Sequence, residues 1–405
     1  MLGRCACLVV LLLTGLLPLC AQPLSSQATI SLLTYSPGGD LYAAFGHSAL
    51  RVRDSARQYD VVFNYGMFSF DEGNFYLKFA QGTLKYWLGV YDFSYLKQES
   101  IQHNRAIREQ VLNLDAAERQ AVYDYLLLNL QPEHRYYSYD FFYDNCVTRI
   151  RDLLRDVLGD RLQLDTVSYV NNQSFRDLID RYAKPHPWGD FGIDLALGAR
   201  VDRRAPAIDY LFLPDYASWS LGQSTVERNG KREPLVRREI TLYPKQTKST
   251  TDPAYGTPMV IFGGLLAVSL VATFWCRKKT PYRGPDIVLF LLCGIAGTVV
   301  LLLWIATDHA ATKDNYNLLW LHPLHGVSAG LLFWKKQGVY TKLYFLANGL
   351  FCLSILFLWN ILPQQFHPSF IPIVALLAFR YCYWFSKTKF YRPIYIQENR
   401  TRIRG

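Results

Sequence analysis

The sequence predicts an α+β exported domain followed by a five-helix α-helical transmembrane domain. Two observations lead to this fold class. Strand-like and helix-like apolar patterns are mixed in the first 250 residues, whereas the last 150 residues hold long and almost uninterrupted apolar runs. A chain of 405 residues is long enough for two or three domains. The two kinds of pattern indicate that its two halves fold in different solvents.

The first 21 residues have the features of a secretory signal peptide. A basic start at Arg4 precedes an apolar run over residues 8–19, and the small residue Ala21 follows it. Cys20 raises the alternative of a lipoprotein signal, but Leu19 stands where such signals usually carry a small residue. Cleavage near Ala21 is the preferred interpretation, and an uncleaved anchor is the alternative. The domain that follows is expected outside the cytoplasm.

The predicted elements of the exported domain, residues 22–184, come in a mixed order. Apolar alternation predicts strands at residues 30–33, 49–53 and 59–63. Residues 75–82 are expected to be a helix or an irregular segment, and residues 86–96 a hairpin. An amphipathic helix is expected at residues 115–130, where Asp115 and Glu118 have the spacing of a capping box. Residues 185–257 are interpreted as a mixed strand and loop extension of the same domain.

Cys146 is the most informative residue of the exported domain. Of eight cysteines, three lie in the leader and four in apolar segments near the C-terminus, so Cys146 alone belongs to the exported part. Helical spacing of apolar residues begins at Val147, and Asp144 or Asn145 can cap that helix. A helix N-terminus favours the thiolate, which is the nucleophilic form of cysteine. A lone thiol at this position indicates a nucleophile, with a buried and inert cysteine as the alternative.

A cysteine nucleophile needs a base, and His47 is the best candidate. It opens a predicted strand between Gly46 and Ser48, whereas the other histidines of the exported domain lie among charged residues or between prolines: His103, His134 and His186. The alternative is a structural histidine within the core. Three residues are candidates to orient the imidazole ring: Asn64, Tyr65 and Asp144.

The membrane domain is expected to span the bilayer five times. Five apolar segments of about 20 residues follow residue 258, close to the length that a spanning helix requires. They cover residues 258–276, 286–307, 316–334, 340–362 and 366–385, and a basic tail at 386–405 follows.

Basic residues in the connections predict the orientation of these spans. Thirteen Lys or Arg lie in alternate connections and the tail, while the other two connections contain only Lys313. The positive-inside rule therefore places the exported domain on the outer side of the membrane and the tail in the cytoplasm. The formal net charge of +10 is explained by these segments, so the sequence offers no surface suited to nucleic acid.

Polar residues gather near the outer ends of the predicted spans. Such residues are costly near lipid and often mark function, so they are candidates for binding substrate. The alternative is that they cap broken helices and pair with one another. No spacing typical of a metal site joins them, and no cofactor is implied. The set comprises Asp308, His309, Asn315, Asn317, His322 and His325.

The motifs FGHSALRV, FNYGMFSF and YDNCVTRIRDLL, in this order, resemble the exported domain of the Lnb family of bacterial lipoprotein N-acyltransferases. The segment DHAATKDNYNLLWLHPL and the five-span layout look like the C-terminal half of that family. The exported domain is also similar to circularly permuted papain-like folds of the NlpC/P60 class. The resemblance implies a Cys146 nucleophile and a His47 base, with Asn64 as the candidate third residue. Asp144 and Asn145 beside Cys146, with Tyr65, are candidates for contacting substrate.

The resemblance implies acyl transfer through a Cys146 thioester. The donor would be a phospholipid, and the acceptor would be the α-amine of a diacylglyceryl-modified cysteine at a lipoprotein N-terminus. Two other functions fit the residues. A cysteine peptidase or amidase acting on peptidoglycan would use the same Cys146 and His47 without lipid. A non-catalytic envelope receptor or assembly factor would leave Cys146 inert.

Overall fold

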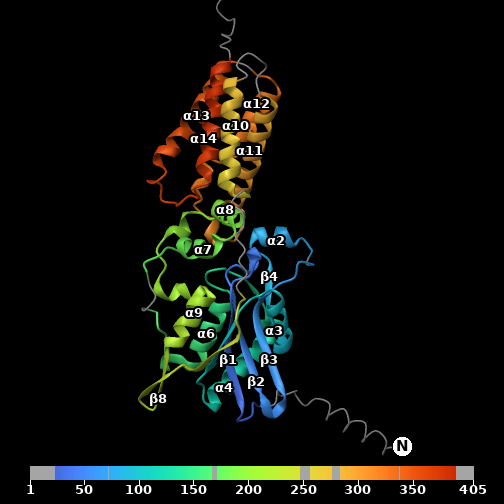
Figure 1. Ribbon diagram of the computed structural model, residues 1–405, viewed down its shortest axis with the longest axis vertical. Helices are drawn as coiled ribbons and strands as arrows, with labels where there is room; N and C mark the ends of the chain where they lie inside the picture. The colour runs from blue at the N-terminus through green and yellow to red at the C-terminus, as the bar shows by residue number, and fades with distance from the viewer. Residues whose placement is uncertain are drawn as a thin grey trace, which may run out of the picture.

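The computed structural model describes residues 23–71, 73–166, 171–246, 256–275, 283–336 and 338–388. The predicted leader and all of the basic tail beyond residue 388 lie outside these ranges, as do the basic residues at 277–279. Figure 1 shows an elongated molecule with a sheet domain at one end and a helical bundle at the other. Helices α7 (Phe175–Ala183) and α8 (Pro187–Ala196) lie between them.

A seven-stranded antiparallel sheet is the centre of the exported domain. Its strand order is β10-β5-β1-β2-β3-β4-β6. Pairing is in register along the full length of β1 and β2, from Ala28 opposite Asp54 to Tyr35 opposite His47. The strands cover Ala28–Tyr35 (β1), His47–Asp54 (β2), Tyr59–Met67 (β3), Lys85–Asp92 (β4), Ile107–Leu112 (β5), Tyr136–Ser138 (β6) and Val236–Tyr243 (β10). The three strands expected from apolar alternation, at residues 30–33, 49–53 and 59–63, are confirmed.

Both faces of this sheet are buried, because successive apolar side chains of a strand point to opposite faces. On β1, Leu32 belongs to a core shared with α4 (Ala116–Leu130) and α6 (Cys146–Leu158). The neighbouring Leu33 points the other way and packs in a smaller core with α3 (Phe93–Gln102). Successive side chains of a strand point to opposite faces, so one apolar run supplies both cores. The sheet therefore lies between two helical layers.

Two expectations about this domain need correction. The hairpin predicted at residues 86–96 is wrong, because β4 ends at Asp92 and α3 begins at Phe93. The extension at residues 185–257 was expected to consist of strands and loops, but its described residues also form the helices α8 and α9 (Pro214–Gln223). Its last strand, β10, pairs with β5 and forms the edge of the main sheet. The helix predicted at 115–130 is confirmed as α4, and Asp115 and Glu118 form its capping box.

The rest of the exported domain is short helices and a small second sheet. Helix α2 (Phe75–Gln81) confirms the helical alternative for residues 75–82, and α5 is a single turn at Pro132–Arg135. Helix α9 (Pro214–Gln223) contacts β1 and α6. The second sheet has the order β7-β8-β9, formed by Leu162–Gln163, Thr225–Arg228 and Lys231–Pro234.

The C-terminal part contains five helices among the described residues, but only three are long and apolar enough to cross a bilayer. These are α10 (Pro258–Trp275), α11 (Arg283–Ile305) and α13 (Val339–Leu358). The third predicted span is divided into a 3₁₀-helix at Tyr316–Leu319 and the nine-residue helix α12 (His325–Phe333). Nine residues rise about 14 Å, less than half the ~30 Å of a hydrocarbon core.

The fifth predicted span is the helix α14 (Phe370–Lys387), which packs against α10 and α13. It carries Arg380, which is 2% exposed. Arg380 Nε donates to Asp286 Oδ1 on α11 at 2.7 Å, and Nη1 donates to Thr273 Oγ1 on α10 at 2.7 Å. Trp384 Nε1 donates to Asp286 Oδ2 at 2.7 Å. This buried ion pair, with its bond to Thr273, joins three helices.

Candidate functional site

Cys146 is the first residue of α6. Asn145 is the cap, and its side-chain oxygen accepts from the main-chain N–H groups of Val147 (2.8 Å) and Thr148 (3.0 Å). The Asn145 amide also donates to the main-chain oxygens of Phe141 and Phe212, each at 2.8 Å. The two caps left open by the sequence are therefore resolved in favour of Asn145. Since its side chain is fully engaged, Asn145 holds the helix start in place and is not free to bind a substrate.

His47 lies between Cys146 and Asn64. Its side chain is hydrogen-bonded to Cys146, and its Nε2 is hydrogen-bonded to Asn64 Oδ1. Because Asn64 occupies Nε2, Nδ1 is the ring nitrogen available to the thiol. His47 opens β2, Asn64 lies on the neighbouring β3 and Cys146 starts the helix that packs on both strands. Three segments far apart in the sequence thus bring a thiol, an imidazole and an amide together.

The electrostatics of this group favour the charged pair. Burial raises the pKa of the Cys146 thiol, but the charge of His47 and hydrogen bonds from His47 and from the N–H groups of Ser48 and Cys146 outweigh burial. The pKa of Cys146 is therefore below its ordinary value. Burial lowers the pKa of His47, yet Cys146 and the bond to Asn64 raise it above its ordinary value. The arrangement stabilises a thiolate beside an imidazolium.

Two glycines let the backbone approach this group closely. Gly46, directly before His47, has φ +77°, and a Cβ there would lie 2.8 Å from the main-chain oxygen of Tyr35. Gly66 has φ +86°, and its Cβ would lie 3.7 Å from the Cβ of Cys146. Residues that carry a side chain rarely adopt such positive φ values. Gly46 therefore fixes the entry of His47 into β2, and Gly66 brings the end of β3 against the cysteine.

The group lies at the end of the sheet that faces the membrane domain. His47 is opposite Tyr35, Tyr35 is opposite Ile107, and Ile107 is opposite Tyr243, where β10 ends before α10 begins. At the same end, β3 leads into α2, whose Gln81 carbonyl accepts from the main-chain N–H of Asp308 at 3.1 Å. Figure 1 shows α2 facing the helical bundle.

Asp144 and Tyr65, two further candidates, have contacts of their own. Asp144 receives two bonds from Arg149, at 2.6 and 2.8 Å, and the Arg149 guanidinium lies 3.6 Å from the centre of the Tyr137 ring. Tyr65 is 2% exposed and packs edge-on to Tyr137. Neither side chain contacts His47 through a described hydrogen bond. Arg149, which the sequence reasoning missed, is three residues after Cys146 on the same helix, and this spacing was the available signal.

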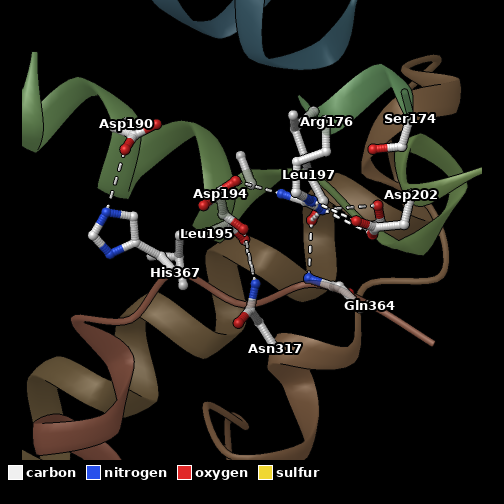
Figure 2. Close-up of polar contacts among 12 residues, drawn as sticks. Ser174, Arg176, Asp190, Asp194, Leu195, Leu197, Asp202, Asn317, Gln364 and His367 are labelled. Atoms are coloured by element: carbon white, nitrogen blue, oxygen red, sulfur yellow. Dashed lines mark hydrogen bonds and ion pairs between the residues drawn. The ribbon is translucent and has the colours of Figure 1, made fainter. Parts of the chain in front are cut away.

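Asn315 and Asn317 join the membrane domain to the exported domain. The Asn315 amide donates to the carbonyls of Leu195 (2.9 Å) and Ala196 (3.0 Å), and the Asn317 amide donates to the carbonyl of Asp194 (3.0 Å). These carbonyls end α8, where helical partners are missing. Figure 2 shows Asn317 directed at this end of α8. Both asparagines are 0% exposed, so their contacts favour a structural role.

The same interface contains a buried ion network. Arg176 on α7 donates to Asp202 Oδ1 at 2.7 Å and to Asp194, and it also bonds the carbonyl of Gly198 at 3.2 Å. Gln364 of the membrane part donates to the carbonyl of Leu197 at 3.1 Å. Figure 2 shows these groups converging from both domains. The exported domain is therefore held to the membrane domain by polar contacts at α7 and α8.

The remaining polar candidates divide between two places. His309 Nε2 lies 2.9 Å from the carbonyl of Phe79, so Asp308 and His309 both contact α2. His325 is 0% exposed; its Nδ1 lies 2.6 Å from the Tyr381 hydroxyl, and its Nε2 lies 2.8 Å from the carbonyl of Trp320. The ring of His322 stacks on His325 at 4.1 Å. These residues do not form one cluster with Cys146.

One group of three carboxylates among the described residues has the spacing of a metal site. Oxygens of Asp180, Asp190 and Asp194 lie within 4.8 Å of one another. Asp194 is bonded to Arg176, and Asp190 Oδ2 lies 3.4 Å from His367 Nε2. Since Arg176 already balances the charge of Asp194, we assign no metal to them.

A cavity of about 610 Å³ opens beside the loop that precedes His47. Ala44 from that loop lines it, together with the basic side chains of Arg181 and Lys245 and the acidic side chain of Asp215. Cys146, His47 and Asn64 are not among the residues that line it, so the cavity is separate from that group.

Comparison with known proteins agrees with this architecture. Residues 22–181 match a family model described as the Lnb N-terminal periplasmic domain, and residues 249–390 match one described as the Lnb transmembrane domain. No curated protein and no solved structure matches the chain, so the circular permutation expected of the exported domain stays a prediction. The two matches follow each other in the expected order and cover most of the sequence. The chain belongs to the Lnb family, with a periplasmic N-terminal domain and a transmembrane C-terminal domain.

Proposed function

We propose that the protein is a lipoprotein N-acyltransferase in which Cys146 is the nucleophile, His47 the base and Asn64 the residue that orients His47. The observation that carries the proposal is the position of His47, which is hydrogen-bonded to the thiol on one side and to Asn64 on the other. Membership of the Lnb family is consistent with an acyltransferase. The site also lies at the membrane-facing end of its domain, where both substrates are anchored.

In the first half of the reaction, the Cys146 thiolate attacks the ester carbonyl carbon of a phospholipid. The main-chain N–H groups of Ser48 and Cys146, which are directed at the sulfur, stabilise the negative oxygen of the tetrahedral intermediate. The bond to the glycerol oxygen breaks, and His47 gives its proton to that oxygen. A lysophospholipid leaves, and the acyl chain remains on Cys146 as a thioester.

In the second half, the α-amine of a diacylglyceryl cysteine attacks the thioester carbonyl. His47 takes a proton from the amine, an amide forms and the Cys146 thiolate leaves. Water would compete with the amine, but Cys146 is only 7% exposed, so bulk water has little access to the thioester. The reaction is an exchange of an ester for an amide, and it needs no external energy source.

The experiment that tests this proposal is intact-mass analysis of the purified full-length protein in detergent micelles that contain phospholipid. We expect a mass gain of one acyl chain, which disappears when a synthetic diacylated lipopeptide is added. Cys146→Ala is the control and should gain no mass. Acyl-peptide product should appear in the same samples by mass spectrometry.

The other outcomes separate the alternative functions. Absence of an adduct together with cleavage of peptidoglycan fragments would replace the proposal by a cysteine peptidase or amidase. Absence of both activities would indicate a non-catalytic receptor or assembly factor. Full transfer activity in Cys146→Ala would exclude the thioester mechanism.

A further inference from the structure

Three large apolar side chains of the exported domain are exposed within ten residues of one another. Phe70, Leu77 and Phe79 are 60%, 57% and 53% exposed. Leu77 and Phe79 lie on α2, and Phe70 lies shortly before it. The rings of Phe70 and Phe79 both lie against that of Phe75, with centroids 4.8 and 6.2 Å away. Exposed apolar residues that gather in this way mark a surface that contacts a protein or a membrane. The partner of this surface can be identified from its surroundings.

Helix α2 is attached to the outer end of a membrane span. The span α11 ends at Ile305, and the main-chain N–H of Asp308 donates to the carbonyl of Gln81 at 3.1 Å. The ring of His309 is hydrogen-bonded to the carbonyl of Phe79, and a Cβ on Gly82 would lie 3.3 Å from that ring. The C-terminal turn of α2 therefore lies within a few residues of the membrane-spanning helix, at the level of the lipid headgroups.

The end of α11 continues this exposed apolar surface. Leu302 and Ile305 are 48% and 68% exposed, as expected for side chains that face lipid. The lipid that covers Ile305 also reaches α2, because Asp308 and His309, in the loop after Ile305, are bonded to α2. The occupant of the α2 surface is therefore the bilayer, and a protein partner would have to displace lipid from the neighbouring span.

Aromatic rings lead from this surface to the candidate catalytic group. The ring of Phe79 lies 6.2 Å from Phe75, Phe75 lies 5.9 Å from Phe68, and Phe68 lies 5.5 Å from Tyr86. Tyr86 stacks on Tyr139 at 4.4 Å.

The last step of this series reaches the cysteine. The Tyr139 ring lies 3.5 Å from the position of a Cβ on Gly66, and that position is 3.7 Å from the Cβ of Cys146. The apolar surface at the membrane is thus continuous with the wall of the site.

We propose that α2 with Phe68 and Phe70 is a lipid-contacting segment, which enters the outer leaflet and guides a phospholipid acyl chain along the aromatic series to Cys146. The contact with lipid stands independently of the reaction. The guidance of the acyl chain rests on the proposed acyltransferase function. Apolar side chains held at the bilayer surface lower the cost of moving an acyl chain from lipid toward the site, because the chain is not exposed to water.

The lipid contact is tested with the full-length parent protein in nanodiscs of phosphatidylethanolamine and phosphatidylglycerol. The discs contain a trace of phosphatidylcholine with a photoreactive diazirine in its acyl chain. After illumination and digestion, we expect lipid adducts on the peptide that contains Leu77 and Phe79 as well as on the spans. Adducts on the spans alone would overturn the proposal.

The role in acyl delivery is tested with the double variant Leu77→Ser/Phe79→Ser. Formation of acyl-Cys146 from nanodisc phospholipid should fall about tenfold or more, as expected when two apolar anchors are lost. Alkylation of Cys146 by iodoacetamide, a small water-soluble reagent, should keep the parental rate. The matched control is Tyr95→Ser/Leu128→Ser, which changes two side chains with 60% and 47% exposure elsewhere on the same domain.

Each outcome decides one proposal. An equal loss of acylation in the control, or no loss in the α2 variant, would overturn the guiding role of α2. If the parent forms no acyl-enzyme at all, the acyltransferase proposal fails, and the photo-adducts still decide whether α2 contacts lipid.

Discussion

The side-chain amide of Asn317 in the membrane domain donates to the main-chain oxygen of Asp194 in the exported domain, at 3.0 Å (Figure 2). Asn317 also accepts from Trp320 Nε1 at 3.0 Å, so both ends of the amide are used. A contact of this kind fixes the distance between a periplasmic helix and the bilayer. Mutation of Asn317 therefore tests the interface directly.

Asn317→Ala should lower the free energy of unfolding by about 1–3 kcal/mol, because it leaves a buried carbonyl of α8 without a donor. The measurement is denaturation of the full chain in mixed detergent micelles. Asn348→Ala is the control, since the Asn348 amide bonds Tyr344 within its own helix and not the exported domain. Equal losses in the two variants would contradict a specific role for the interface.

Alkylation of Cys146 by iodoacetamide should persist below the pH at which an ordinary thiol becomes unreactive. The charge of His47 and the hydrogen bonds to the sulfur hold the pKa of Cys146 down against burial, so the thiolate survives as the pH falls. His47→Ala should move the alkylation profile to higher pH. The profile is followed by intact mass, with Cys146→Ala to identify the site. An unchanged profile would show that His47 does not stabilise the thiolate.

Asn64→Ala should reduce acyl transfer about 10- to 100-fold through loss of the orientation of His47. Asn64 positions the imidazole and does not touch the reacting atoms, so the rate constant kcat should fall with little change in KM. Asn64→Gln should recover part of the rate if its longer amide reaches His47 Nε2. A rise in KM at constant kcat would indicate a substrate contact for Asn64.

Asp180→Asn should stabilise the protein at alkaline pH and leave it nearly unchanged at acid pH. Burial, followed by the charges of Asp194 and Asp190, raises the pKa of Asp180 from 3.8 to about 7. The folded state therefore holds the Asp180 proton more tightly than the unfolded state. The resulting stability is complete below pH 4 and is lost as the pH rises toward 7.

Thermal unfolding at pH 5 and pH 8 checks this expectation. The gain of Asp180→Asn over the parent should be larger at pH 8. Asp124→Asn, which removes an exposed carboxylate on α4, serves as the control and should show no such difference. A gain that is equal at both values of pH would show that ionisation of Asp180 is not the cause.

Asp286→Leu should destabilise the helical bundle by about 3–5 kcal/mol, because it leaves the buried Arg380 guanidinium without its partner. The double variant Asp286→Leu/Arg380→Leu should regain part of this loss, since no buried charge remains. Denaturation by sodium dodecyl sulfate in mixed micelles measures both. A double variant less stable than either single variant would contradict the pairing.

Features carried by neighbouring residues were predictable from the sequence. The start of α6 follows from the apolar spacing after Cys146, with its cap limited to Asp144 or Asn145, and β1 to β3 follow from simple alternation. The proximity of His47, Asn64 and Cys146 was a hypothesis based on residue type and order. The geometry of these three residues depends on the pairing of β2 with β3, which a single sequence does not specify.

Features that depend on distant contacts were not predictable in the same way. Residues 316–334 are apolar enough for a span, yet the turn at Pro323 and the hydrogen bonds of Asn317 and His325 divide them into two short helices. The pairing of β10 with β5 was not predicted, because β5 lies more than 100 residues earlier in the chain. The hairpin predicted at residues 86–96 included the first residues of α3, since a short apolar run fits a strand as well as a helix.

The position of β10 also has a consequence for biogenesis. This strand forms the edge of the seven-stranded sheet, and among the described residues it is the last strand before α10 begins at Pro258. The sheet is therefore complete only after residue 243 has crossed the membrane, long after His47 and Cys146 have emerged. The periplasmic domain reaches its final form as the first span is being inserted, so secretion of one domain and membrane integration of the other converge on a single step.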